Sequence, residues 1–133
     1  MKTTLAVCVA AIGLLWSAGP AFAHHAFTAE FDASKPIKMT GTVTKFEWTN
    51  PHAWFYIDVK NDAGTVTNWG FEMNSPNTLL RNGWRRNSLK PGDVSTVEAF
   101  GARDGSHIGN AKAVTLASTG QKLFAAPNQG QGQ

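Results

Sequence analysis

Apolar and polar positions alternate most regularly along residues 52–60, directly after the turn signal Asn50-Pro51. The odd positions of this run carry apolar side chains, and the even positions carry polar or amphipathic ones, starting with His52. A period of two is typical of a β-strand that has one face on a core. The odd positions are therefore predicted to be buried, and His52, Trp54 and Tyr56 are predicted to share the opposite face.

Further runs of the same kind predict four other strands and one short helix. The strands are expected over residues 36–48, 66–73, 94–102 and 108–116. In the first of them the apolar residues change parity after Val43, which predicts a β-bulge, and Gly41 is an expected point of sharp curvature. Between the third and fourth strands, Ser75-Pro76 is typical of a helix start and Gly83 of a helix end.

Three strands, a short helix and two strands predict an all-β fold. The order and the size match a small OB-like β-barrel of five antiparallel strands, with the helix between strands three and four. An open antiparallel sandwich is the alternative. The barrel domain is expected at 36–118, after an extended N-terminal arm at 24–35. Residues 119–133 are rich in Gln, Asn and Gly and are predicted to form a polar, disordered tail.

The first 23 residues have the features of a secretory signal peptide. Lys2 precedes an apolar run over 5–16, and Ala21-Phe22-Ala23 is an A-x-A cleavage site. The run is shorter than the roughly 20 apolar residues that a transmembrane helix needs. The chain is therefore predicted to be exported to the periplasm, to be cleaved after Ala23, and to keep no membrane span.

Cleavage changes the composition in two ways that bear on function. It removes Cys8, the single cysteine of the chain, so disulfides cannot stabilise the mature protein. It also removes Lys2 and no acidic residue, so the formal charge falls from +3 to +2. A charge this small and dispersed argues against a nucleic-acid surface. No feature predicts self-association, and a monomer is expected.

The cleaved terminus is the main candidate for chemistry. His24 would offer a free α-amine and an imidazole that chelate one metal together. A further imidazole from His25, His52 or His107 would complete a set of three nitrogens suited to Cu(II). This arrangement is similar to the histidine brace of exported copper proteins. The alternatives are a frayed terminus without a ligand, a structural His52 that bonds its turn or stacks between Trp48 and Trp54, and an exposed His107 at a hairpin tip.

Aromatic side chains form the second candidate surface: Trp48, Trp54, Tyr56 and Trp69. OB-like proteins bind extended ligands across aromatic-bearing strands, which would suit a small molecule, a sugar, a peptide or a protein partner, including an exported enzyme complex with this chain as accessory subunit. The alternative is that these rings only cover a small core.

Charged residues offer weaker signals. Glu47 and Glu72 flank the aromatic strands and are candidates to support a ligating histidine. Arg81, Arg85 and Arg86 form a basic cluster after the helix, either a solvated surface or a site for an acidic partner or lipid head group. No serine has the G-x-S-x-G context and the mature chain has no thiol, so an enzyme is not predicted.

Four motifs together indicate a family: His24-His25-Ala26-Phe27, Gly41-Thr42-Val43, Trp48-Thr49-Asn50-Pro51-His52-Ala53 and Leu89-Lys90-Pro91-Gly92-Asp93. They resemble a family of small exported bacterial proteins, domain of unknown function 6152, over most of residues 24–116. The resemblance implies a periplasmic OB-like β-barrel and implies no established activity. The His-His and Asn-Pro-His motifs of that family fall here on His24, His25 and His52.

Overall fold

The structure is a computed structural model that describes residues 27–126 of the 133-residue chain. It divides into two units, residues 1–30 and residues 31–133. In the first unit the described residues 27–30 are helical, so the predicted extended arm at 24–35 is wrong there. The second unit contains β1 (Phe31–Glu47), β2 (Trp54–Lys60), β3 (Val66–Glu72), α3 (Pro76–Arg81), β4 (Val94–Ala102), β5 (Ile108–Leu116) and β6 (Lys122–Phe124). Among the described residues no helix is long and apolar enough to cross a bilayer.

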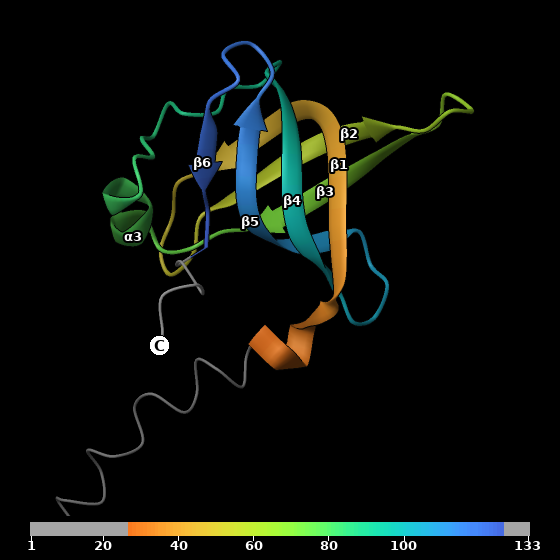
Figure 1. Ribbon diagram of the computed structural model, residues 1–133, viewed down its shortest axis with the longest axis horizontal. Coiled ribbons are helices and arrows are strands. Elements are labelled where there is room, and N and C mark those ends of the chain that lie inside the picture. Colours follow the sequence, from red (N-terminus) through yellow and green to blue (C-terminus); the bar gives the residue numbers. More distant parts are fainter. Residues whose placement is uncertain (1–26, 127–133) are drawn as a thin grey trace, which may run out of the picture. The chain divides into compact units, whose positions relative to one another are not determined.

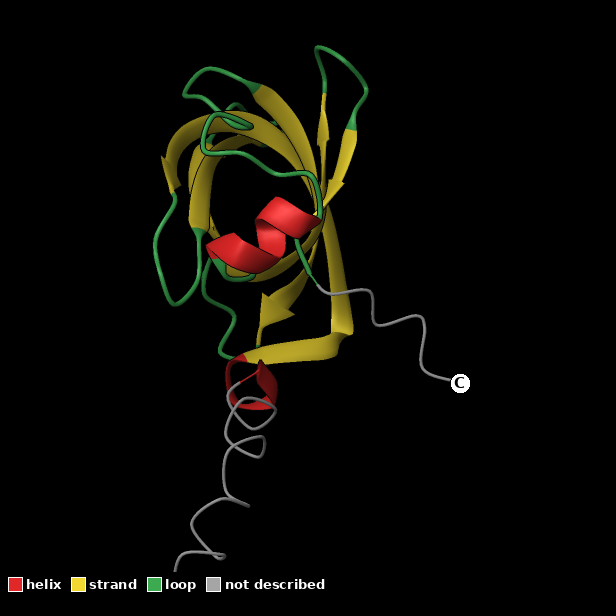
Figure 2. Cartoon of the chain, turned by 90° about the vertical axis from the view of Figure 1, so that its left-hand side faces the viewer, coloured by secondary structure: helices red, strands yellow, loops and turns green. Residues whose placement is uncertain are grey.

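Five strands close a ring in the hydrogen-bonded order β1–β2–β3–β5–β4–β1, with β6 added beside β5 (Figures 1 and 2). This closed sheet, with α3 between β3 and β4, confirms the all-β, OB-like prediction over the open sandwich. The expectation of wholly antiparallel strands is wrong at one pairing, because β3 and β5 are parallel from Gly70↔Ile108 to Glu72↔Asn110. An odd number of strands cannot alternate in direction all the way round a closed ring.

The long first strand bends so that it can pair with β4 and then with β2. Its register to β2 shifts between Val43 and Lys45, which confirms the predicted bulge. Gly41 lies just before the bulge, where β1 passes so close to β2 that a Cβ on Gly41 would be 2.5 Å from the carbonyl oxygen of Asp58. The curvature predicted at Gly41 therefore depends on the missing side chain.

Both ends of the ordered fold extend further than the sequence pattern predicts. β1 begins at Phe31 rather than at residue 36, because Phe31 is buried and pairs with Ala102 of β4. At the other end, β6 pairs with β5 and buries Leu123, and Ala125 is buried just after it. The predicted disordered tail is therefore wrong for residues 122–126, where the apolar run 123–126 supplies two buried side chains that anchor the chain. Residues 127–133 lie outside the described part.

The helix α3 covers one end of the ring and contributes to the core (Figure 2). As predicted, Ser75 caps it by accepting a hydrogen bond from the Thr78 N–H, and Pro76 occupies the first turn. Leu79 of the helix and Trp84 after it are fully buried with the inward side chains of β1 to β5. The indole N–H of Trp84 donates to the Phe124 carbonyl oxygen over 2.9 Å, which joins the helix region to β6.

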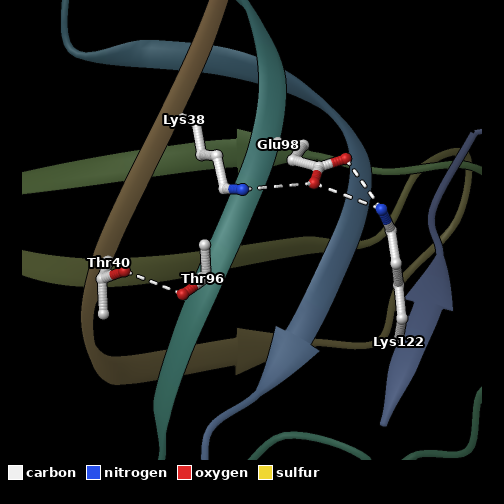
Figure 3. A network of polar contacts seen from close by, with 5 residues as sticks. All are labelled: Lys38, Thr40, Thr96, Glu98 and Lys122. Atoms are coloured by element: carbon white, nitrogen blue, oxygen red, sulfur yellow. Dashed lines mark hydrogen bonds and ion pairs between the residues drawn. The ribbon is translucent and has the colours of Figure 1, made fainter. Parts of the chain in front are cut away.

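A polar network crosses the outer surface of β1, β4 and β6 (Figure 3). Glu98 of β4 accepts two hydrogen bonds from Lys122 of β6, at 3.2 and 3.0 Å, and lies 3.8 Å from the ammonium of Lys38 on β1. The Thr40 and Thr96 hydroxyls are hydrogen-bonded at 2.8 Å. The Lys122 ammonium lowers the pKa of Glu98 below 4.5.

The Glu98 network should contribute to stability only above acidic pH. A carboxylate whose pKa is depressed in the folded state stabilises the fold above its unfolded-state pKa and stops doing so as the pH falls through the folded-state value. We expect Glu98→Gln to lower the free energy of unfolding by about 0.2–0.5 kcal/mol at pH 7, since the group is partly exposed, and by nothing measurable at pH 3. Urea unfolding at both pH values, with Asp62→Asn as an exposed control, measures this. An equal loss at pH 7 and pH 3 would contradict it.

Candidate functional site

The end of the β1–β2 turn brings His52 against Glu72. His52 lies two residues before β2, and the Asn50–Pro51 peptide before it is cis. The Thr49 hydroxyl donates to the His52 carbonyl oxygen over 3.3 Å. The imidazole Nδ1 is hydrogen-bonded to Oε1 of Glu72, at the last position of β3. The His52 side chain is 48% exposed, whereas that of Glu72 is 13% exposed. A carboxylate on Nδ1 leaves Nε2 as the ring nitrogen that is available to a ligand.

This contact follows from the register of the β2–β3 hairpin. The turn at residues 61–64 pairs Lys60 with Val66, and the ladder continues to Trp54↔Glu72. His52 lies two residues beyond Trp54 and so reaches the same carboxylate. Counting outward from the turn could have predicted this neighbour, although in the sequence His52 and Glu72 stand out separately. The predicted stacking of His52 between Trp48 and Trp54 is not among the ring contacts of residues 27–126.

Trp54 and Tyr56 lie together on the outer face of β2, as the alternation predicts. Their rings are stacked at a centroid distance of 6.4 Å. Tyr56 lies against β3 at Gly70, where a Cβ would be only 3.0 Å from the tyrosine ring. Its hydroxyl donates to Glu47 over 3.3 Å, and Lys45 is paired with the same carboxylate. Burial and the Glu47 carboxylate raise the pKa of Tyr56.

The other two rings of the predicted aromatic surface lie elsewhere. Trp69 packs against the core, stacked on Phe71 at 6.3 Å, and the His107 imidazole is 4.9 Å from its ring. Trp48 packs edge-on against Phe46 at 5.8 Å. The structure therefore brings Trp54 and Tyr56 together but does not join all four rings into one platform.

The four candidate metal ligands are described only in part. His24 and His25 lie outside the described residues. His52 contacts Glu72, and His107 contacts Trp69. Within residues 27–126, no three His, Cys, Asp or Glu side chains are grouped closely enough to hold a metal ion. A site that uses His52 therefore needs ligands from another part of the chain.

A groove that the sequence does not reveal lies between the β1–β2 turn and the α3 region. It has a volume of about 540 Å³ and is lined by Trp48, Asn50, Pro76, Asn77, Leu80, Arg85, Arg86 and Asn87. The sequence singled out Trp48 and the arginine cluster, but for separate reasons. Their meeting depends on α3 closing the end of the ring, and no local sequence signal encodes it.

These features define a small OB-like β-protein with a histidine–carboxylate pair on its outer surface. The chain belongs to a family whose model, described as "Family of unknown function (DUF6152)", matches residues 11–112. No curated protein matches the chain. Among solved structures it is similar to the crystal structure of the mitochondrial single-stranded DNA binding protein Rim1 from S. cerevisiae, with 13% identity and a TM-score of 0.49 over 65% of this chain and 94% of that one. Function has to be argued from this chain's own residues.

Proposed function

We propose that the protein is a periplasmic copper-binding protein that holds one Cu(II) through His24 and His52. Export would remove residues 1–23 at the A-x-A site and expose the α-amine of His24. That amine and the His24 imidazole then supply two nitrogens to the same ion. His52 supplies the third through Nε2. Nitrogen ligands in a planar arrangement suit Cu(II).

The hydrogen bond between His52 and Glu72 is the observation that carries this proposal. A metal-ligating histidine usually donates its second ring N–H to a carboxylate or carbonyl, which fixes the tautomer and the ring orientation. Glu72 meets this requirement at Nδ1, and the half-exposed imidazole keeps its Nε2 for a metal. His107 contacts an indole ring instead, so its orientation has no such support within the described chain. We therefore favour His52 as the third ligand.

The strand register places Glu72 near the N-terminal part of β1. One ladder runs across the ring from Pro36 to Phe100, from Phe100 to Asn110, and from Asn110 to Glu72. Three steps of about 4.8 Å bring the backbone of Glu72 within about 15 Å of Pro36. The proposal requires His24, which precedes β1 in the chain, to reach His52 and Glu72.

Copper titration of the mature chain tests the proposal. A chain that begins at His24, verified by its mass, should take up one Cu(II) in competition with a chromophoric chelator. Placing Gly-Ser-Gly before His24 should weaken the affinity at least about 100-fold, because it removes the amine from the chelate. Three residues are added because a single one would put His25 third from the terminus and create a different copper site. His52→Gln should weaken the affinity about tenfold or more.

His107→Gln is the matched control, since it removes an exposed imidazole that the proposal does not use. Its affinity should equal that of the unmodified chain. Unchanged affinity of the extended chain would exclude the terminal amine from the site. A loss in His107→Gln without a loss in His52→Gln would show that the third ligand is assigned to the wrong histidine.

A further inference from the structure

We propose that the groove between the β1–β2 turn and α3 binds a small organic anion. Its carboxylate or phosphate would pair with Arg86, and its planar apolar part would lie against Trp48. This site is separate from the copper ligands and does not depend on them. Three features of the groove support such binding: its volume, its charge and the placement of one indole ring.

The size and lining of the groove suit a small molecule. Its volume of about 540 Å³ falls within the roughly 300–1,000 Å³ that ligand pockets occupy. Trp48, Pro76 and Leu80 supply apolar surface, and Leu80 remains exposed although it belongs to the helix that closes the ring. Three carboxamides, those of Asn50, Asn77 and Asn87, offer both donors and acceptors. A few polar groups on a partly apolar wall are typical of a site that orients its ligand.

The charge of the groove selects an anion. Arg85 and Arg86 both line it, and no aspartate or glutamate does. Nη1 of Arg85 donates to the carbonyl oxygens of Trp84 at 2.7 Å and Leu80 at 3.3 Å, which holds this guanidinium in place. Glu47, Glu72 and Glu98 form ion pairs with other residues of the described chain and not with Arg86. A guanidinium can bind a carboxylate or phosphate through two parallel hydrogen bonds.

Trp48 gives the site its apolar wall. The ring is half-buried, and its edge-on contact with Phe46, with an interplanar angle of 77°, fixes its orientation. Phe46 in turn packs on the buried Trp84, so the indole is supported by the core. A supported aromatic ring beside a guanidinium matches a ligand that combines a planar ring with an acidic group.

Chemical-shift titration of the metal-free mature chain with 2-naphthoate tests this proposal. The mature chain has four tryptophans, so the indole N–H signal of Trp48 can be followed directly. We expect 2-naphthoate to shift this signal with a Kd on the order of 1 mM or tighter. The neutral 2-naphthylmethanol and inorganic phosphate should each bind at least about fivefold more weakly, because each lacks one half of the recognised chemistry.

Arg86→Gln should weaken 2-naphthoate about tenfold, because it removes a charge-assisted hydrogen bond. Arg81→Gln is the matched control. It removes the same charge nearby, but Arg81 bonds Thr78 and does not line the groove, so binding should be unchanged. If both variants weaken 2-naphthoate binding equally, the loss reflects the overall charge of the protein and not a specific contact. That result would overturn the proposed site. Equal binding of 2-naphthylmethanol and 2-naphthoate, or no response at Trp48, would also overturn it.

Discussion

Gly41→Ala is expected to lower the free energy of unfolding by about 3 kcal/mol, although it adds a single methyl group. The new Cβ would lie 2.5 Å from the Asp58 carbonyl oxygen and 3.1 Å from both its carbonyl carbon and Cδ1 of Ile57. Asp58 belongs to the backbone of β2, so no side-chain rotation can relieve the overlap. Either β1 and β2 separate or the bulge shifts, and both weaken the ring. Overpacking of this kind costs about 1–3 kcal/mol and occasionally more, a large part of the stability of a small domain.

Gly101→Ala is the matched control for this prediction. Gly101 is also a buried strand glycine, but the nearest atom to a Cβ there is Cγ2 of Ile37 at 3.7 Å, an ordinary contact. Its stability should stay within about 0.5 kcal/mol of the original, because replacing glycine also restricts the unfolded chain. Urea unfolding of the two variants, followed by circular dichroism, measures the difference. Equal stabilities would show that the crossing of β1 and β2 is loose enough to accept a side chain.

Trp84→Ala is expected to cost about 3–5 kcal/mol, comparable to the removal of other large core side chains. The ring is completely buried, contacts Phe46, and donates its N–H to the Phe124 carbonyl oxygen. The substitution therefore opens a cavity under α3 and releases β6 at once. Trp54→Ala, which removes an equally large but half-exposed ring from the outer face of β2, should cost less than about 1 kcal/mol.

Trp84→Phe separates the two contributions of Trp84. It keeps an aromatic ring in the core but removes the donor to Phe124, so we expect a loss of about 1–2 kcal/mol. Amide hydrogen exchange of residues 122–125 should accelerate relative to exchange in β2, because β6 loses its link to the helix region. Unchanged exchange in β6 would show that pairing with β5 alone holds this strand.

The sequence determined the features that depend on near neighbours along the chain. Alternation after Asn50-Pro51 placed Phe55 and Ile57 in the core, the change of parity after Val43 marked the bulge, and Ser75-Pro76 marked the start of α3. These signals are local, because the period of a strand and the cap of a helix are set within a few residues. The strand order and the position of the helix then predicted the OB-like class.

The tertiary structure decided what depends on contacts between distant segments. It showed that Leu123 and Ala125, in a short apolar run of the predicted tail, are buried and anchor β6. It also showed that Phe31 starts β1 earlier than its own neighbourhood suggests. Their burial is a property of the closed ring, because only closure provides the apolar surface that they cover.

In the candidate sites, too, the sequence indicates individual residues and the tertiary structure decides which of them meet. The sequence alone drew attention to His52, but the register of β2 and β3 supplied Glu72 as its partner. Trp48 and Arg86 are far apart in the chain and share a groove only because α3 packs across the end of the ring. A side chain's chemistry can be identified from the sequence, whereas its neighbours across strands are fixed by how the whole chain closes upon itself.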